Sequence, residues 1–529
     1  MIIFFNGIIH TMDAARPRAS AMVVNSQTGK IELVGRLEQF PTFEPGTQII
    51  DLGGRTMIPG FNDAHVHIWQ LGLLLTVQVD ARAHVAPDLP ALINQFRARA
   101  AETPPGQWIT GRGYNEVTLA EGRHPTRADL DAASTDHPLA VRRTCGHMLV
   151  ANSRALELAG ITAQTPAPPG GVIDRDADGE PTGLIKETAM GLINRVVPPL
   201  DDETVGHAIR EATFHQLRLG ITSATDPMIE PDQMRVYRKL DADADLALRV
   251  NGLAMRWADG ASAPYPLPER YIGEMLRIDG VKFFADGGLS GATAAIGQPY
   301  KGSTDQGVLR FETDTLRELM WEAHTADYRI GVHAIGAAAI EQVLTIYEDI
   351  LHQRPQPELR HRIEHLGLPT ADQLRRCAAL GIIAVPQTVF LPALGASFRR
   401  YLPDALLANC YPVRSMLDAG LTVALSTDAP VVPDDNPLLG IKAALDRRGP
   451  DGAPIAPDQA ITVGEALYAY TMGGAIASGD AGTVGSITPG KWADLVVLSA
   501  DPLAAEYSDV LLDIHVDQTY IGGRLVYER

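Results

Sequence analysis

Hydrophobic residues in the middle of the chain recur in one order: a helical pattern, a glycine, and then a β-branched run. The order occurs at 212–225, at 371–385 and at 415–425. Each glycine stands where a helix end needs a residue with positive φ. Because consecutive parallel strands need helical crossovers, this order predicts an α/β fold with a parallel sheet.

Eight segments qualify as strands of this sheet, and eight is the number that closes a (β/α)₈ barrel of the TIM type. A doubly wound open sheet is the second choice, since no Gly-x-Gly-x-x-Gly follows an early strand. The candidate strands are Met57–Phe61, Ile221–Thr225, Leu248–Leu253, Gly280–Phe284, Ile330–His333, Arg362–His365, Ile382–Val385 and Leu421–Ser426.

Short β-type runs at both ends of the chain flank this middle. Residues 1–54 and 480–529 are expected to build one small composite β-sandwich, because chain ends usually lie close together. The barrel is expected over 55–479. An insertion at about 80–205, with a helix capped by Asp88, separates the first two strands and is predicted to roof the mouth of the barrel.

Composition narrows the class of partner. A net charge of −19 over 529 residues argues against a nucleic-acid surface. No apolar run is long enough for a membrane span, and the apolar start lacks the basic residues of a signal peptide. The three cysteines are scattered, as in proteins of reducing compartments. We therefore expect a cytoplasmic protein with a small-molecule substrate.

Residues that can bind metal ions stand at the ends of the predicted strands. His65 and His67 are two apart, so a strand directs both imidazoles to one side, and two imidazoles are half of a zinc or iron site. A lone histidine at a strand end is more often a core residue, but barrel enzymes gather their active sites at these ends. The candidate ligands are His65, His67, Lys282, His333, His365 and Asp428.

Several motifs resemble those of the metal-dependent amidohydrolase superfamily. They are Pro59–His67, Val281–Gly288, His333–Gly336, His361–His365, Ser426–Asp428 and Gly485–Leu498. The insertion, with Gly146-His147 and Asn152-Ser153, is similar to that of the amidohydrolase-3 branch, which includes N-substituted formamide deformylases. The chain departs from the family pattern at one position: Ala337 follows Gly336, where the family often has Asp. This difference affects either the residues that hold the metal ligands in place or the choice of substrate.

The resemblance implies roles for the candidate ligands. His65 and His67 would bind the more buried of two divalent ions, most often zinc, with Asp428, and His333 and His365 the more exposed one. Lys282 has only donors as an ammonium and would bridge both ions as a carbamate formed with CO₂. Asp428 would carry the proton from water to the leaving nitrogen. A homodimer is also expected.

Four further residues are candidates for the surroundings of the site. His147, on the predicted roof, is a candidate to donate to the carbonyl oxygen of the substrate or to bind a carboxylate of the substrate. A role in ordering the roof loop suits His147 equally. Tyr114 and Arg82 are candidates for the same substrate-binding wall. Asp286 is a candidate to orient Lys282 or a histidine.

These observations favour a metal-dependent hydrolase of a carbon–nitrogen bond in an amide, formamide or cyclic amide. A mononuclear deaminase on the same barrel is an alternative, although such an enzyme leaves Lys282 without a role. A decarboxylase or isomerase on the same metal site is another. A non-catalytic assembly module is the remaining alternative, and such relatives usually lose ligands that are all present here.

Overall fold

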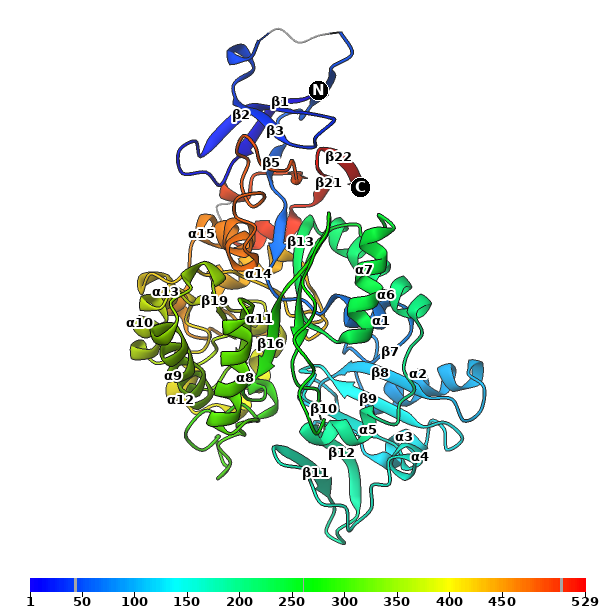
Figure 1. Cartoon of the computed structure of the whole chain (residues 1–529). Helices are drawn as coiled ribbons and strands as arrows, with labels where there is room; N and C mark the ends of the chain where they lie inside the picture. The colour runs from blue at the N-terminus through cyan, green and yellow to red at the C-terminus, as the bar shows by residue number, and fades with distance from the viewer. Residues whose placement is uncertain (42–44, 260, 505–507) are drawn as a thin grey trace.

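The computed structural model describes residues 1–41, 45–259, 261–504 and 508–529, which form three sheets (Figure 1). The sheet built from both termini lies at the top of Figure 1, the parallel sheet in the middle, and the sheet of the insertion at the lower right. The fold is mixed α/β, as the sequence predicts. Among the described residues, no helix has both the length and the apolar character needed to cross a membrane.

The parallel sheet follows the predicted strands in chain order, with every neighbouring pair parallel. Helices precede several strands and end at glycines with positive φ, for example Gly220, Gly381 and Gly420 at 77°, 68° and 85°. Its strands are β6 (Phe61–Asp63), β13 (Ile221–Ile229), β14 (Arg249–Met255), β16 (Leu276–Phe284), β17 (Arg329–Ala334), β18 (Arg362–His365) and β19 (Ile383–Val385), with β15 (Tyr271–Ile272) antiparallel to β16.

Helices connect and follow these strands and cover the sheet (Figure 1). They are α1 (Ile68–Thr76), α6 (Asp202–Arg218), α7 (Pro231–Ala242), α8 (Thr313–Thr325), α9 (Ala337–Gln353), α10 (Ala371–Ala379), α11 (Phe390–Tyr401), α12 (Asp404–Leu407), α13 (Val413–Asp418), α14 (Pro437–Asp446), α15 (Val463–Tyr468) and α16 (Gly474–Ser478).

The prediction of a regular eighth strand at Leu421–Ser426 is wrong. Val423 makes one isolated parallel bridge to Ala384 of β19. On the other side, Ala64 N donates to Leu425 O at 3.5 Å and Asp428 N donates to His65 O at 2.7 Å. The segment therefore spans the gap between the last strand and the first, and it closes the barrel without a full ladder.

The first predicted strand, Met57–Phe61, is two strands that belong to different sheets. β5 (Thr56–Pro59) pairs antiparallel with β20 (Leu495–Leu498), whereas β6 pairs with β13. Gly60 separates them, and a Cβ at this position would lie 2.0 Å from Thr222 Oγ1. Only glycine fits where the chain passes from one sheet into the other.

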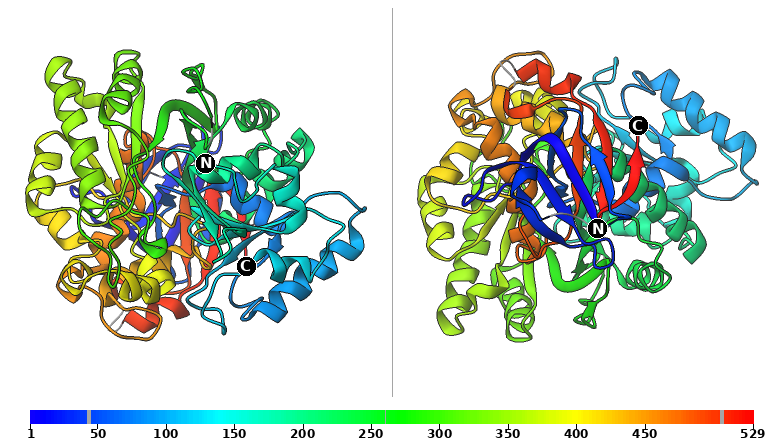
Figure 2. Two further views of the ribbon diagram at one scale, coloured as in Figure 1. Left: turned by 90° about the horizontal axis from the view of Figure 1, so that it is seen from below. Right: turned by 90° about the horizontal axis from the view of Figure 1, so that it is seen from above.

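Strands from both termini share one sheet, in which the N-terminal and C-terminal strands lie side by side (Figure 2). β1 runs unbroken through Asn6-Gly7, with a change of register between Phe5 and Ile9. The sandwich description stays a prediction. The strands are β1 (Ile2–His10), β2 (Arg18–Val24), β3 (Ile31–Gly35), β4 (Gln48–Asp51), β5, β20, β21 (Val516–Ile521) and β22 (Arg524–Glu528).

The insertion has a sheet of its own, which the sequence analysis did not predict. Its helix α2 (Leu89–Glu102) is capped as predicted, since Asp88 Oδ1 accepts from Ala91 N at 2.8 Å. The domain boundaries stay a prediction. The other elements are β7 (Val79–Asp80), β8 (Ile109–Tyr114), β9 (Leu139–Arg143), β10 (Met148–Ala151), β11 (Gly171–Arg175), β12 (Pro181–Glu187), α3 (Arg127–Asp131), α4 (Ser153–Leu158) and α5 (Gly191–Asn194).

Candidate metal centre

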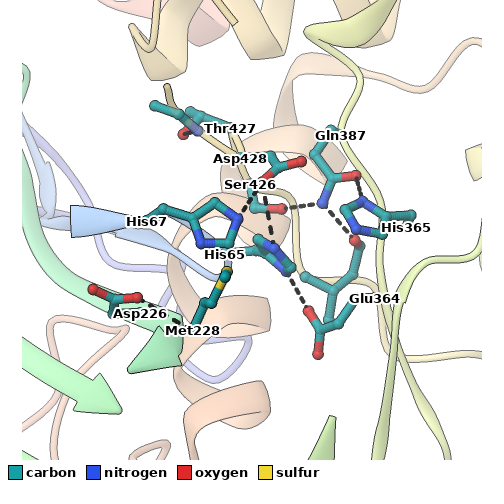
Figure 3. Close-up of polar contacts among 12 residues, drawn as sticks. His65, His67, Asp226, Met228, Glu364, His365, Gln387, Ser426, Thr427 and Asp428 are labelled. Atoms are coloured by element: carbon teal, nitrogen blue, oxygen red, sulfur yellow. Dashed lines mark hydrogen bonds and ion pairs between the residues drawn. The ribbon is translucent and has the colours of Figure 1, made fainter. Parts of the chain in front are cut away.

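His65 and His67, which follow β6, lie next to Asp428, which comes directly after the segment 421–426 that closes the barrel (Figure 3). His67 Nε2 lies 3.0 Å and His65 Nε2 lies 3.4 Å from Asp428 Oδ1. His365, the last residue of β18, joins them: one ligand atom each of His65, His365 and Asp428 lies within 4.8 Å of the others. The structure thus brings four of the six predicted ligands together, all buried.

His333, near the end of β17, extends this cluster toward the roof. Its ring centroid lies 4.5 Å from that of His365 and 5.2 Å from that of His147. His333 Nε2 donates to Gly287 O at 3.0 Å, since a carbonyl only accepts, and this leaves Nδ1 as its free ligand atom. The imidazoles form a continuous row along the cavity wall.

Two residues that sequence reasoning missed orient the ligands. His65 Nδ1 lies 2.6 Å from Glu364 Oε2, and His365 Nδ1 lies 2.7 Å from Gln387 Oε1 (Figure 3). Arg362 pairs with Glu364 at 2.5 Å. With Nδ1 occupied, the Nε2 atoms of both histidines are directed to the centre, which is how partners of metal-binding histidines usually act.

Lys282 lies fully buried on β16, and its Nζ, 4.6 Å from the centroid of the Phe284 ring, has no hydrogen-bond partner among the residues that the structure describes. Burial lowers the pKa of Lys282 to about 8. Asp286 lies 3.4 Å from His333 Nε2, and its carboxylate accepts from the backbone N–H groups of Ala295, Ile335 and Gly336. It therefore supports the loops around His333, and in the described part of the chain it makes no hydrogen bond to Lys282.

The donor set fits a divalent cation. Burial is the main cause that lowers the pKa of His65 to about 3 and that of His365 to about 4, so both are neutral, the form that binds metal. Burial alone would raise the pKa of Asp428, but the neighbouring His65 and His67 hold it below its ordinary value.

Within the described residues, four of these side chains have a buried polar atom without a hydrogen-bond partner: His65 Nε2, His67 Nδ1, Lys282 Nζ and Asp428 Oδ1. Buried polar atoms normally have partners, so a cluster of unpartnered ones at one place needs an explanation. Imidazole and carboxylate ligands are those of zinc sites. A divalent cation bound in the cluster would satisfy His65 Nε2 and Asp428 Oδ1.

Of the three predicted substrate-binding residues, the structure places one on the cavity wall and two away from it. His147 lies on the cavity wall with Nδ1 3.0 Å from Glu187 Oε2. Tyr114 is buried in the roof, with its hydroxyl 3.2 Å from His124 Nδ1, and Arg82 pairs with Asp80 at 2.7 Å. Neither Tyr114 nor Arg82 lines the cavity, so their predicted contact with substrate is not supported by this geometry.

The cavity above the cluster opens to solvent, and the space that no atom fills in it and at its mouth amounts to about 780 Å³. Aromatic and aliphatic side chains such as Phe284, Phe390 and Phe398 form much of its wall. The roof contributes Arg112 and Arg142, neither of which the sequence analysis selected. The site can therefore accept a small molecule with apolar and charged parts.

Comparisons with known proteins agree with this geometry. The family model described as amidohydrolase family matches residues 48–527. The N-substituted formamide deformylase of Arthrobacter pascens is 30% identical over 544 residues, which cover 100% of this chain and 98% of that protein.

Solved structures are similar over the same length. An uncharacterized metal-dependent hydrolase from Pyrococcus horikoshii superposes with a TM-score of 0.75 at 27% identity, over 96% of this chain and 98% of that one. Atrazine chlorohydrolase TrzN from Arthrobacter aurescens, solved in complex with zinc, gives 0.54 at 14% identity over 100% and 95%. The second likeness shows a shared fold alone.

Proposed function

Because the chain belongs to the amidohydrolase family, we propose that it hydrolyses a carbon–nitrogen bond of a small amide, formamide or cyclic amide with the help of divalent metal ions. The observation that carries this proposal is the buried cluster of His65, His365 and Asp428 at the base of a cavity. The similarity to a formamide deformylase over the whole chain supports the class of bond.

We assign the metal ligands as the motifs suggest: His65, His67, His333, His365 and Asp428, for two zinc ions. A divalent ion in such a site lowers the pKa of water and polarises a substrate carbonyl. Lys282 joins the set if its neutral amine nitrogen adds to CO₂ and loses one proton, which gives a carbamate with two oxygen ligands. Its pKa of about 8 favours this addition, because more of the amine is neutral than in an exposed lysine.

Asp428 is placed to move the proton. It is a carboxylate held between two histidines, with Oδ1 3.0 Å from His67 Nε2, and it can accept a proton from the attacking water and pass it to the leaving nitrogen. His147 faces the same cavity and can donate to the substrate carbonyl oxygen, while Glu187 orients its ring. A homodimer, a cytoplasmic location and the absence of nucleic-acid and membrane partners stay predictions.

A hydrolysis screen of the metal-reconstituted protein tests the proposal. N-formyl, N-acyl, cyclic-amide and ester substrates are compared for wild type and Asp428→Asn, with metal content measured for both. We expect amide turnover in wild type and a loss of roughly 100- to 10,000-fold in the variant, the usual contribution of a general acid–base. No turnover together with no bound metal would instead support a non-catalytic module, and release of ammonia from a ring amine would support a deaminase.

A further inference from the structure

Two arginines stand next to each other on the face of the roof that closes the cavity. Arg112 of β8 and Arg142 of β9 are register partners on adjacent parallel strands, and both line the cavity. Like charges at neighbouring positions of a sheet destabilise it. A fold that keeps such a pair at the wall of a cavity needs a compensating anion.

Neutral groups hold both guanidinium groups in place without neutralising them. Arg112 Nη1 donates to Gln70 Oε1 at 2.8 Å, and Arg112 Nε, fully buried, has no partner. Arg142 donates to Gly146 O at 3.0 Å and to Asn194 Oδ1 at 3.1 Å. In the part of the chain that the structure describes, no carboxylate lies within 4.0 Å of either guanidinium group.

Other arginines near the cavity differ in this respect. Arg143, the next residue on β9, is fully buried and pairs with Glu116 at 2.6 Å. Arg310, also on the cavity wall, pairs with Asp259. Asp259 and Glu230 act on Arg142 only from beyond ion-pair distance. Asp428 likewise acts on Arg112 only from beyond ion-pair distance. Within the described residues, Arg112 and Arg142 therefore have no ion-pair partner, and Arg112 is only 4% exposed, where an unpaired charge is costly.

We propose that Arg112 and Arg142 bind a carboxylate of the substrate, so that the substrates are amides that carry a free carboxylate, such as N-acylated amino acids. A guanidinium group offers two parallel N–H donors that match the two oxygens of a carboxylate. The apolar wall formed by Phe284, Phe390 and Phe398 then faces the uncharged part of the molecule, and the amide meets the histidine cluster. This inference rests on the proposed hydrolase function for the fate of the amide, but not for the binding of the anion.

Binding to the metal-free protein tests the anion site without catalysis. Calorimetric titration compares 3-phenylpropionate with 3-phenylpropanamide, which differ in charge at similar shape, after removal of metal by a chelator so that the acid cannot bind an ion. We expect the acid to bind roughly 10- to 100-fold more tightly than the amide, the range for hydrogen bonds to charged groups. Arg112→Gln and Arg142→Gln should each reduce this preference, whereas Arg154→Gln, an exposed arginine of the roof helix α4, should keep it.

Equal binding of acid and amide to wild type would overturn the proposal, as would a preference that survives in both variants. Thermal unfolding of the variants guards against misfolding: removal of one of two adjacent like charges should leave the midpoint unchanged or raise it. A variant that fails to fold leaves the other arginine variant and the wild-type comparison to decide.

Turnover distinguishes this inference from the hydrolase proposal. N-formylphenylalanine and its carboxamide are compared with the metal-loaded enzyme. We expect a lower KM for the acid than for the carboxamide in wild type and a smaller difference between the two KM values in Arg112→Gln. Tight binding of the acid with no turnover of any amide would refute the hydrolase and keep the anion site. Turnover of both substrates with equal KM values would keep the hydrolase and overturn the anion site.

Discussion

Gln387 determines which nitrogen of His365 faces the metal centre. Its amide nitrogen donates to Val385 O and Ser426 Oγ at 2.8 and 2.9 Å, so its oxygen must accept from His365 Nδ1. His365 Nε2 is then free of hydrogen and directed to the centre. We expect Gln387→Met to lower the affinity for divalent metal roughly 10- to 100-fold, as loss of such partners usually does.

Ser426→Ala is the matched control for this prediction. It removes one bond that orients the Gln387 amide but leaves the Val385 carbonyl as an acceptor. Competition with a chelator of known affinity measures the metal dissociation constant of both variants. Equal dissociation constants for Gln387→Met and wild type would mean that Gln387 does not position His365.

Substitution of Lys282 tests whether the site binds one metal ion or two. If its carbamate bridges the site, Lys282→Met should reduce the bound metal from two ions per chain to one and abolish hydrolysis. Lys301→Met, at an exposed lysine paired with Asp404, is the control and should change neither. Metal analysis of each purified chain gives the stoichiometry. Activity and metal content that are intact in Lys282→Met would favour a mononuclear deaminase.

The metal ligands could be predicted from the sequence better than the residues that orient them or line the cavity. His65, His365 and Asp428 stand at strand ends, which topology brings together. Glu364 contacts His65 across 299 positions of sequence, and no local pattern contains that contact. On β8 the sequence analysis selects Tyr114 and not Arg112, although strand alternation would put both on one face. A change of register between them, with Gly113 at φ 109°, turns Tyr114 into the roof.

At the scale of elements, periodicity predicted the helices and most strands but not how they join. The run at Leu421–Ser426 has the composition of a strand, yet Leu425 N donates to Ala469 O, outside any strand. Met57–Phe61 is apolar throughout, so composition alone could not divide it at Gly60. Both outcomes depend on which backbone groups a segment meets after folding, and that information lies in distant residues.

A pair of buried histidines joins α8 and α9 to the parallel sheet and should make the barrel sensitive to acid. Ile330 N donates to His361 Nδ1 at 3.1 Å, and His324 Nε2 donates to Arg354 O at 2.8 Å. The remaining bond, from His361 Nε2 to His324 Nδ1 at 2.9 Å, therefore exists only while His324 is neutral, and the bond from Ile330 N exists only while His361 is neutral. Burial, and then the charge of His324, lowers the pKa of His361 from 6.5 to about 3.

The sign of the pH dependence follows from this lowered pKa. The unfolded chain binds a proton at His361 below pH 6.5 while the folded chain does not, so the stability contributed by this residue is complete above 6.5 and declines toward pH 3. At pH 5 the loss is about 2 kcal/mol. We expect the free energy of unfolding of His361→Gln to fall less steeply between pH 6.5 and 5 than that of wild type.

Denaturant unfolding at each pH measures this difference. His352→Asn, at an exposed histidine of α9, is the control and should keep the wild-type slope. The slope separates titration from a general loss of packing, which would lower stability equally at every pH. Parallel curves for wild type and His361→Gln would show that folding does not lower the pKa of His361.

At the scale of the whole molecule, the metal ligands come from both sides of the place where the barrel closes. His65 follows the first strand, His365 ends the sixth, and Asp428 lies on the segment that spans the gap. That segment is joined to its neighbours by hydrogen bonds outside a regular ladder, among them Asp428 N to His65 O and Ala424 N to Ala384 O. Because the ligands come from both sides of the place where the barrel closes, a bound ion would connect the two sides.

Removal of metal should therefore loosen the closure before the rest of the fold. At a free metal concentration about 100-fold above the dissociation constant, binding adds about 2.7 kcal/mol to the free energy of unfolding. We expect a chelator to lower the thermal midpoint and to speed amide hydrogen exchange at 64–67 and 424–428. Exchange in β20 and β21 of the terminal sheet, which supplies no ligand, should stay constant and is the internal control. Equal acceleration in both regions would mean that the metal stabilises the molecule uniformly, and no change in either would mean that the closure stands without it.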